Sequence, residues 1–172
     1  RWVQYGVFNP LARIHSFRET VEQVPWHHGN EAREIIKRFL ELRTRLAPLT
    51  NDLFWKAMED GTPLMRPLIW DYWQEELPDH PWIPYEFLWG PFLVAPVVDA
   101  GHLGKEVYLP GQGQVWYDFW TRRPYEGGRS HHVEAKLDTL PLFIKAGSIV
   151  PMGRPLQDLT TNDNHLFLLA YS

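Results

Sequence analysis

The chain of 172 residues carries a net charge of -4 and contains no cysteine, so disulfides and thiolate metal sites are excluded. Its length fits one ordinary domain, or a small domain joined to part of another. Its lysines and arginines form no basic stripe, which argues against nucleic-acid binding, and no apolar run reaches the length of a membrane span. The lack of cysteine fits a reducing compartment such as the cytoplasm but does not exclude secretion.

Residues 1–61 are expected to form helices and loops. In the run GNEAREIIKRFLELRTRL, Asn30 is expected to cap a helix, because asparagine accepts hydrogen bonds from the first turn. Apolar residues recur there at helical spacing and predict one buried face: Ile35, Ile36, Phe39, Leu42 and Leu46. Pro48 should break this helix near Ala47. A second helix, TNDLFWKAMEDG, should end at Gly61, since glycine favours the cap position.

Residues 62–172 have a different composition and pattern. Short runs rich in β-branched and aromatic residues are separated by Gly, Pro and Asp, which is typical of an antiparallel sandwich or barrel. The fold class is therefore expected to be mixed α and β. One sandwich core is predicted to bury these side chains: Leu93, Val94, Val97, Val107, Leu142, Ile144, Ile149 and Leu168.

The residues alone indicate no catalytic constellation. Two pairs of histidines are adjacent in sequence: His27-His28 and His131-His132. Neighbouring side chains rarely converge on one ion and no HExxH pattern is present, so no metal site is expected. A GxSxG elbow and a phosphate loop are also missing, and no cofactor is implied. Asp118 and Asp138 are best interpreted as structural residues of strand ends and turns.

Aromatic residues make up 15% of the chain, which suits either a β-rich core or stacking surfaces for sugars. A non-catalytic carbohydrate-binding sandwich would use exposed Trp73, Trp82 or Trp89 as such surfaces. A purely structural sandwich would instead turn its aromatic side chains inward. The direction of these side chains distinguishes the two alternatives.

The opening run RWVQYGVFNPLARIH resembles the segment that follows the acid/base aspartate in glycoside hydrolase family 31, the retaining α-glucosidases, α-xylosidases and their relatives. The matching residues are Arg1, Trp2, Gly6, Phe8, Pro10, Arg13 and His15. Tyr5 and Val7 depart mildly from the family pattern, Leu11 stands where an aromatic residue is common, and Ile14 stands where a small polar residue is common. Further stretches resemble the family in order along nearly the whole chain: VPWHHG, FLELRTRLAPLTNDLFWKAMEDGTPLMRPL, EFLWGPFLVAPVV, VYLPG, VWYDFWT and LDTLPLFIKAGSIVPM.

This resemblance implies two regions. Residues 1–61 would form the end of a (β/α)8 catalytic barrel, with GVFNP as its eighth strand, LARIHSF as the loop at the active-site face and the helix after Asn30 as its last helix. Residues 62–172 would form the proximal C-terminal β-sandwich domain. An incomplete barrel would leave an exposed apolar face on the helix at 31–46, so the isolated chain is expected to be prone to association.

The resemblance also implies an activity, namely a C-terminal portion of a retaining α-glycosidase that removes terminal α-linked glucose or xylose from oligosaccharides. The two catalytic aspartates of the family lie upstream of Arg1, so the chain alone should be inactive. His15 is expected to hydrogen-bond sugar hydroxyls, and Arg13 to pair with a carboxylate of the barrel. Phe8 is expected to line the sugar pocket or to pack in the core, and Trp26 is expected to pack beneath the loop or in the core. The sugar, its linkage and the oligomeric state stay open.

Overall fold

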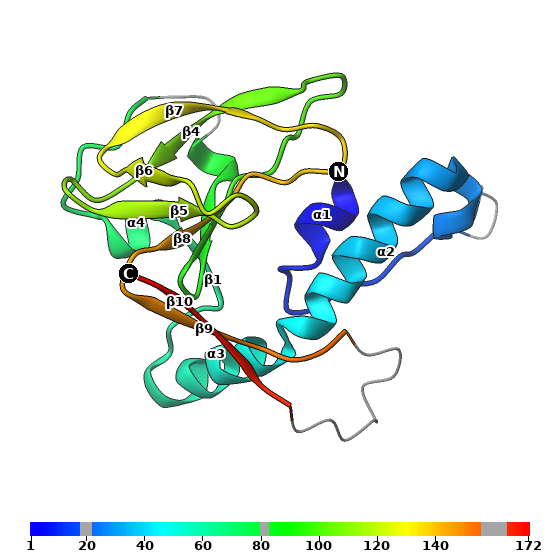
Figure 1. The fold of residues 1–172 in the computed structure, drawn as a ribbon, viewed down its shortest axis with the longest axis horizontal. Helices are drawn as coiled ribbons and strands as arrows, with labels where there is room; N and C mark the ends of the chain where they lie inside the picture. The colour runs from blue at the N-terminus through cyan, green and yellow to red at the C-terminus, as the bar shows by residue number, and fades with distance from the viewer. Residues whose placement is uncertain (18–21, 80–82, 156–164) are drawn as a thin grey trace.

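The computed structural model describes residues 1–17, 22–79, 83–155 and 165–172 (Figure 1). The chain begins with helices and continues with short strands. The helical elements are α1 (Trp2–Gly6), the 3-10 turn η1 (Pro25–His28), α2 (Gly29–Arg45), α3 (Ala47–Asp60), α4 (Leu68–Asp71) and the 3-10 turn η2 (Ile83–Tyr85). No helix among the described residues is long and apolar enough to cross a membrane.

The break between α2 and α3 confirms the prediction made from Pro48. Helix α2 ends at Arg45, and α3 begins at Ala47 with Pro48 in its first turn, where the missing N–H of proline costs nothing. Gly61 ends α3 in the left-handed conformation (φ 77°), and its N–H donates to the Ala57 carbonyl. This conformation favours glycine, as expected for a C-terminal cap.

The start of α2 differs from the prediction. Asn30 lies inside the helix, which begins at Gly29 and has no side-chain cap. The preceding turn η1 already leads the backbone into the helix, because the His27 N–H donates to the Val24 carbonyl. Of the predicted apolar face, Phe39, Leu42 and Leu46 are buried, and Ile35 and Ile36 are partly buried.

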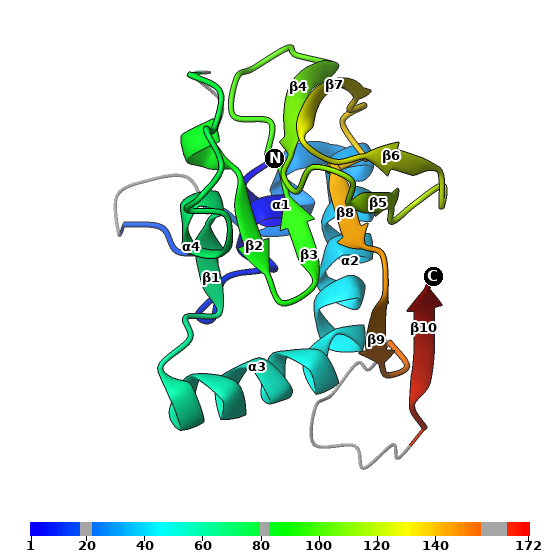
Figure 2. The ribbon, with the colours of Figure 1, turned by 90° about the vertical axis from the view of Figure 1, so that its left-hand side faces the viewer.

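Ten strands form three antiparallel sheets in the described part of the chain (Figure 2). The strands are β1 (Met65–Pro67), β2 (Phe87–Trp89), β3 (Phe92–Val94), β4 (Gly104–Leu109), β5 (Val115–Asp118), β6 (Pro124–Glu126), β7 (Arg129–Glu134), β8 (Leu142–Lys145), β9 (Ser148–Met152) and β10 (Phe167–Tyr171). The largest sheet has the order β1-β2-β3-β8-β5-β6, and β4-β7 and β9-β10 form two-stranded sheets. The prediction of antiparallel strands after Gly61 is confirmed.

The large sheet is covered on both faces, so the prediction of one core is wrong. Phe92 and Val94 belong to a cluster that includes Phe39 of α2, whereas Leu93 between them belongs to a second cluster with Val107 of β4. Successive side chains of a strand point to opposite faces. The helical region therefore covers one face of the sheet, and the β4-β7 pair covers the other.

Two of the residues predicted to be buried are exposed. Ile149 is 61% exposed and Leu168 is 63% exposed, while the other six predicted residues are buried. In the β9-β10 pair, Ile149 lies opposite Ala170 and Leu168 lies opposite Pro151. These residues share the outer face of the pair, since alternate positions point the same way, and the buried Val150 and Met152 take the inner face.

The expected barrel strand at GVFNP is also wrong for this structure. Residues 2–6 form helix α1, and two turn hydrogen bonds follow it, from the Phe8 N–H to the Tyr5 carbonyl and from the Asn9 N–H to the Gly6 carbonyl. A strand needs neighbouring strands to pair its backbone groups. No described strand lies beside this segment, so its N–H groups are paired locally.

Candidate functional site

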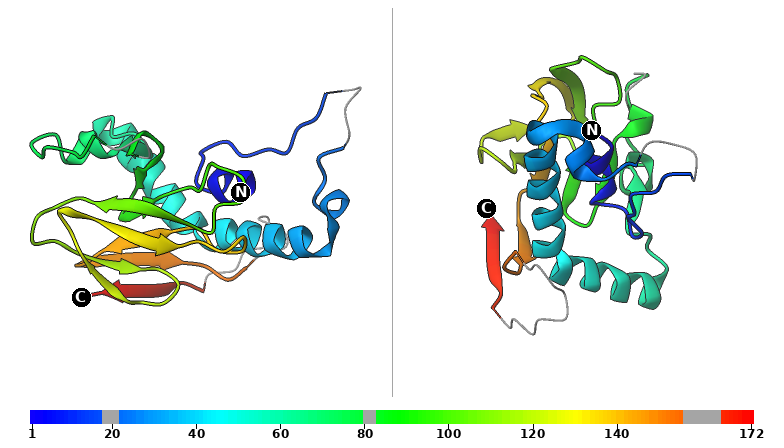
Figure 3. Two further views of the ribbon diagram at one scale, coloured as in Figure 1. Left: turned by 90° about the horizontal axis from the view of Figure 1, so that it is seen from above. Right: turned by 90° about the vertical axis from the view of Figure 1, so that its right-hand side faces the viewer.

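The segment that follows α1 carries the three residues that the resemblance assigns to substrate binding: Phe8, Arg13 and His15. It leaves α1, runs away from the sheets and approaches the start of α2 (Figure 3, left). Phe8 is only 1% exposed, and its ring packs edge-on against Trp89, with ring centroids 5.5 Å apart. Phe8 therefore anchors the segment to the sheet and has almost no free surface for a ligand in this structure.

Arg43 of α2 holds the backbone of the same segment. Its Nη1 donates to the carbonyls of Val7 and Asn9 at 2.7 and 2.8 Å, and its Nη2 donates to the carbonyl of Pro10 at 3.2 Å. The planar guanidinium offers donors in a fixed fork, so one side chain can hold three backbone carbonyls at once. Sequence reasoning missed this residue, because Arg43 is 33 positions or more from the carbonyls that it binds.

Arg13 and His15 lie side by side on the exposed part of the segment. The Arg13 Nη2 lies 2.8 Å from the Nδ1 of His15. Because a guanidinium can only donate, Nδ1 must accept, and the ring proton must then lie on Nε2. No partner for Nε2 is recorded among the described residues. The pair thus presents an exposed N–H donor.

Within the described residues the Arg13 guanidinium contacts His15, and the expected pairing of Arg13 with a carboxylate of the barrel stays a prediction. The structure thus brings Arg13 and His15 together and places Phe8 apart from them, in the core. Trp26 of η1 is 65% exposed. The sugar-binding roles of these residues stay predictions.

The two buried carboxylates have structural partners. Asp118 Oδ1 accepts hydrogen bonds from the backbone N–H groups of Trp120 and Thr121 and from the Thr121 hydroxyl, which stabilises the turn after β5. Glu86, just before β2, lies 3.2 Å from the Nζ of Lys105 on β4, and both side chains are at most 3% exposed. The interpretation of Asp118 as a turn residue is confirmed.

Burial raises the pKa of the Glu86 carboxyl to about 7, although the charge and hydrogen bond of Lys105 and the Tyr108 N–H partly offset this effect. Burial also lowers the pKa of Lys105, and Glu86 opposes that shift. No sequence signal pointed to this pair, because its members are brought together only by the packing of β2 against β4.

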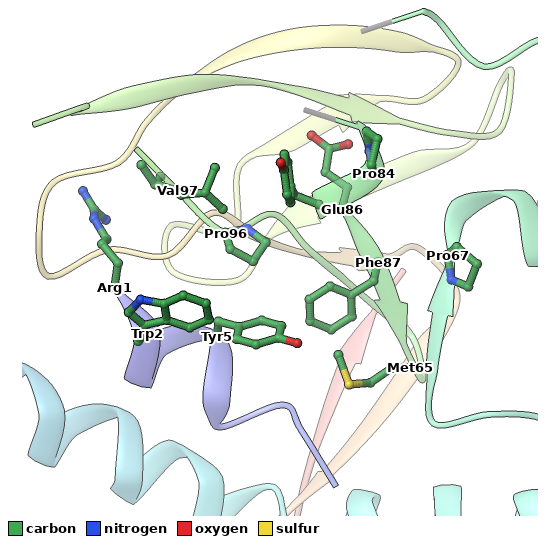
Figure 4. A pocket seen from close by; sticks show the side chains of 12 residues that line it. Arg1, Trp2, Tyr5, Met65, Pro67, Pro84, Glu86, Phe87, Pro96 and Val97 are labelled. Carbon is green, nitrogen blue, oxygen red and sulfur yellow. The ribbon is translucent and has the colours of Figure 1, made fainter. Parts of the chain in front are cut away.

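A cavity of about 590 Å³ opens between α1, η2, β2 and the chain after β3 (Figure 4). We call it the α1 groove and define it by six lining residues: Trp2, Tyr5, Tyr85, Phe87, Val97 and Val98. Its lining is mainly aromatic and aliphatic. Glu86 also borders the groove, and in Figure 4 the Tyr5 ring lies between the rings of Trp2 and Phe87.

The two described tryptophans among those proposed as stacking surfaces differ in burial. Trp89 is 2% exposed and belongs to the core, whereas Trp73 is 69% exposed. Trp82 lies outside the described residues. Among the residues that the structure describes, no group of three or more His, Asp or Glu side chains could hold a metal ion.

Comparison with known families gives two matches. The model of the glycosyl hydrolase family 31 TIM-barrel domain matches residues 1–53, and the model of the glycosyl hydrolase family 31 C-terminal domain matches residues 61–150. The two matches together include nearly every residue from Arg1 to Val150.

Individual relatives agree with the family matches. The chain is 37% identical over 172 residues to Alpha-glucosidase 2 of Bacillus thermoamyloliquefaciens, covering 99% of the chain and 21% of that protein. It is 35% identical over 153 residues to an Alpha-xylosidase of Saccharolobus solfataricus, covering 88% of the chain and 20% of that protein. The chain thus spans about a fifth of the length of these relatives.

A solved structure shows the same arrangement. A GH31 dextranase of Flavobacterium johnsoniae, complexed with isomaltotriose, matches with a TM-score of 0.86 and 35% identity. The match covers 97% of this chain and 20% of the dextranase chain. The likeness therefore includes the helical region as well as the sheets.

Proposed function

The chain belongs to glycosyl hydrolase family 31, and from this premise we propose that it is the C-terminal portion of a retaining α-glycosidase. The whole enzyme removes terminal α-linked glucose or xylose residues from oligosaccharides. The names of the relatives support this substrate class, since they include an alpha-glucosidase and an alpha-xylosidase. The isomaltotriose bound by the matched dextranase supports it too.

In this proposal residues 1–61 complete the catalytic barrel, and residues 62–172 form the adjoining β-sandwich. The order of the two family matches supports this division. A (β/α)8 barrel needs roughly 250 residues, far more than the 53 residues that match the barrel domain. The chain therefore supplies only the end of the barrel.

Retaining hydrolysis needs one carboxylate as nucleophile and a second as acid and then base. Residues that precede Arg1 in the whole enzyme supply both carboxylates. The chain contributes substrate binding through the segment after α1, and it contributes support through the sheets. The exposed Nε2–H of His15 donates a hydrogen bond to a sugar hydroxyl, and such a bond accelerates the reaction only if it strengthens in the transition state.

The observation that carries this role is the hydrogen bond between Arg13 and the His15 Nδ1. It fixes the orientation and tautomer of the imidazole, so that Nε2 is the donor. Phe8 and Arg43 hold the segment on which the pair lies. A separate carbohydrate-binding role for the sandwich is less well supported, because Trp89 and Trp116 are buried. We favour a structural role for residues 62–172.

A chimera tests this proposal. The 172-residue chain replaces the segment of the Bacillus Alpha-glucosidase 2 to which it aligns over its whole length. We expect the chimera to hydrolyse p-nitrophenyl α-glucoside or α-xyloside and the isolated chain to hydrolyse neither. Turnover by the isolated chain above a blank would contradict the proposal, and so would a cooperatively folded chimera that is inactive on both substrates.

A further inference from the structure

Arg43 differs from two other arginines of α2 in what it binds. Arg33 pairs with Glu34 at 2.9 Å, and Arg38 lies 3.7 Å from Asp138. Among the described residues, no carboxylate is recorded within ion-pair distance of Arg43, and its guanidinium instead donates to three backbone carbonyls. Arg43 therefore acts on the path of the backbone rather than on a neighbouring charge.

The three carbonyls lie where the local pairing of the backbone ends. The Asn9 N–H donates to the Gly6 carbonyl, and the next residue, Pro10, has no N–H to donate. In the described part of the chain, no backbone N–H is recorded as a donor to the carbonyls of Val7, Asn9 or Pro10. Carbonyls that are partly removed from water need a partner. The Arg43 guanidinium supplies one to all three, because its donors form a fixed fork.

Arg13 and His15 follow directly after this anchored turn. Between Pro10 and Phe17, no hydrogen bond from one backbone group to another is recorded for the described residues. The direction in which this irregular segment leaves the helical region is therefore set at its anchored end (Figure 3, left). A change in the backbone at Pro10 moves the imidazole that lies five positions farther along the chain.

We propose that Arg43 is a positioning residue of the glycosidase: by holding the carbonyls of residues 7–10, it sets the place from which His15 donates to the sugar. This inference rests on the proposed function, because it requires that His15 contacts the sugar. Arg43 itself does not touch the substrate. A misplacement of about 1 Å caused by a substitution far from the chemistry can cost roughly 10²-fold in rate. A residue of α2 can therefore control the reaction through the segment that it holds.

A double-mutant cycle in the chimera with Alpha-glucosidase 2 tests whether Arg43 acts through His15. Arg43→Met should lower kcat/KM by roughly 10-fold, mainly through kcat, because a displaced imidazole loses a bond that strengthens in the transition state. In a chimera that already carries His15→Ala, the same substitution should lower kcat/KM by less than about 2-fold. Rates are measured well below the melting temperature of each variant and are divided by the folded fraction.

Two matched variants separate the fork from the charge and from the helix. Arg33→Met, on the same helix, should leave kcat/KM unchanged. Arg43→Lys keeps the positive charge, but one ammonium group cannot reproduce the fork, so this variant should show most of the loss. An unchanged kcat/KM in Arg43→Met, an equal loss in the presence and absence of His15, or full activity of Arg43→Lys would overturn the inference.

A second measurement, on the chain of 172 residues, does not depend on activity. The nitrogen resonances of His15 report which ring nitrogen carries the proton, and they should indicate Nε2–H, because Nδ1 accepts from Arg13. Arg43→Met should shift them toward the mixed tautomers of a free imidazole, since the loosened backbone no longer holds the pair together. Arg33→Met should not shift them, and His15→Ala identifies the signals.

Unchanged His15 resonances in a folded Arg43→Met chain would overturn the inference, whatever the chimera does. An unmodified chimera that folds but is inactive would contradict the proposed function instead. The nitrogen resonances would then decide whether Arg43 positions His15.

Discussion

Replacing Lys105 with methionine should strongly destabilise the folded chain at alkaline pH. The side chains of Lys105 and Glu86 are 3% and 1% exposed, and their charged atoms lie 3.2 Å apart. Lys105→Met keeps the apolar stem but leaves the Glu86 carboxylate buried without its counter-charge. Removing one partner of a buried pair costs about 3–5 kcal/mol of unfolding free energy.

The pH dependence of this cost follows from the raised pKa of Glu86. In the native chain that pKa is about 7, against 4.5 for the ordinary carboxyl. The folded state therefore holds the proton more tightly than the unfolded state does, so this contribution to stability is full below about pH 4.5 and is lost as the pH rises through about 7. The difference corresponds to roughly 3 kcal/mol.

Without Lys105 the pKa of Glu86 should rise further, since a favourable charge is removed. The variant should then resemble the native chain at pH 5 and be less stable by up to about 3 kcal/mol at pH 9, because pH 9 lies two pH units above the native Glu86 pKa of about 7. Urea unfolding followed by tryptophan fluorescence measures this difference at both pH values. The double variant Glu86→Gln with Lys105→Met should recover most of the loss, because no buried charge remains.

Lys56→Met is the matched control, since it breaks an exposed ion pair with Asp60 and should change the stability little at either pH. A loss at Lys105 that is the same at pH 5 and pH 9 would refute the reasoning. A loss no larger than that of the control at pH 9 would refute it as well.

Two further predictions concern the segment that carries His15. Phe8→Ala should lower the unfolding free energy by about 3–5 kcal/mol, because it empties a fully packed site. Phe54→Ala on the exposed side of α3 should lower it far less. Equal losses of the two variants in urea unfolding would contradict this prediction. Arg43→Met should cost about 1–3 kcal/mol and make residues 7–10 more sensitive to limited proteolysis. Arg33→Met, which breaks only an exposed pair with Glu34, is its control, and equal proteolysis of both variants would count against the role of Arg43.

Single residues in the sequence predicted the helix ends, which depend on the backbone properties of those same residues. Pro48 and Gly61 mark the end of α2 and of α3, because proline lacks an N–H and glycine tolerates a positive φ. The apolar composition of the strand-like runs predicted the burial of six of the eight residues proposed for the sheets. The recognition of the family also depended on residues that can be read directly, from Arg1 to His15.

Features that depend on distant residues could not be predicted in this way. The sequence does not show which face of the β9-β10 pair lies inside. Ile149 and Leu168 were therefore expected in the core, although the strand pairing places both on the outer face. The expectation that GVFNP forms a strand came from the family resemblance, and a barrel strand needs neighbouring strands that only a complete barrel provides. In the same way, Arg43 binds Val7, and Lys105 pairs with Glu86, across long distances in the sequence. No pattern of residue spacing predicts such contacts.

His15 provides the most direct test of the account, measured in the chimera with Alpha-glucosidase 2. His15→Ala removes the exposed N–H donor that Arg13 orients. Because the hydrogen bond from His15 to the sugar should strengthen in the transition state, we predict that kcat/KM falls by roughly 10²-fold, about 3 kcal/mol. The melting temperature should change little, because an exposed polar side chain leaves no apolar cavity. His132→Ala, at an exposed histidine of β7, should leave kcat/KM unchanged. A His15→Ala chimera with near-normal kcat/KM would contradict the account.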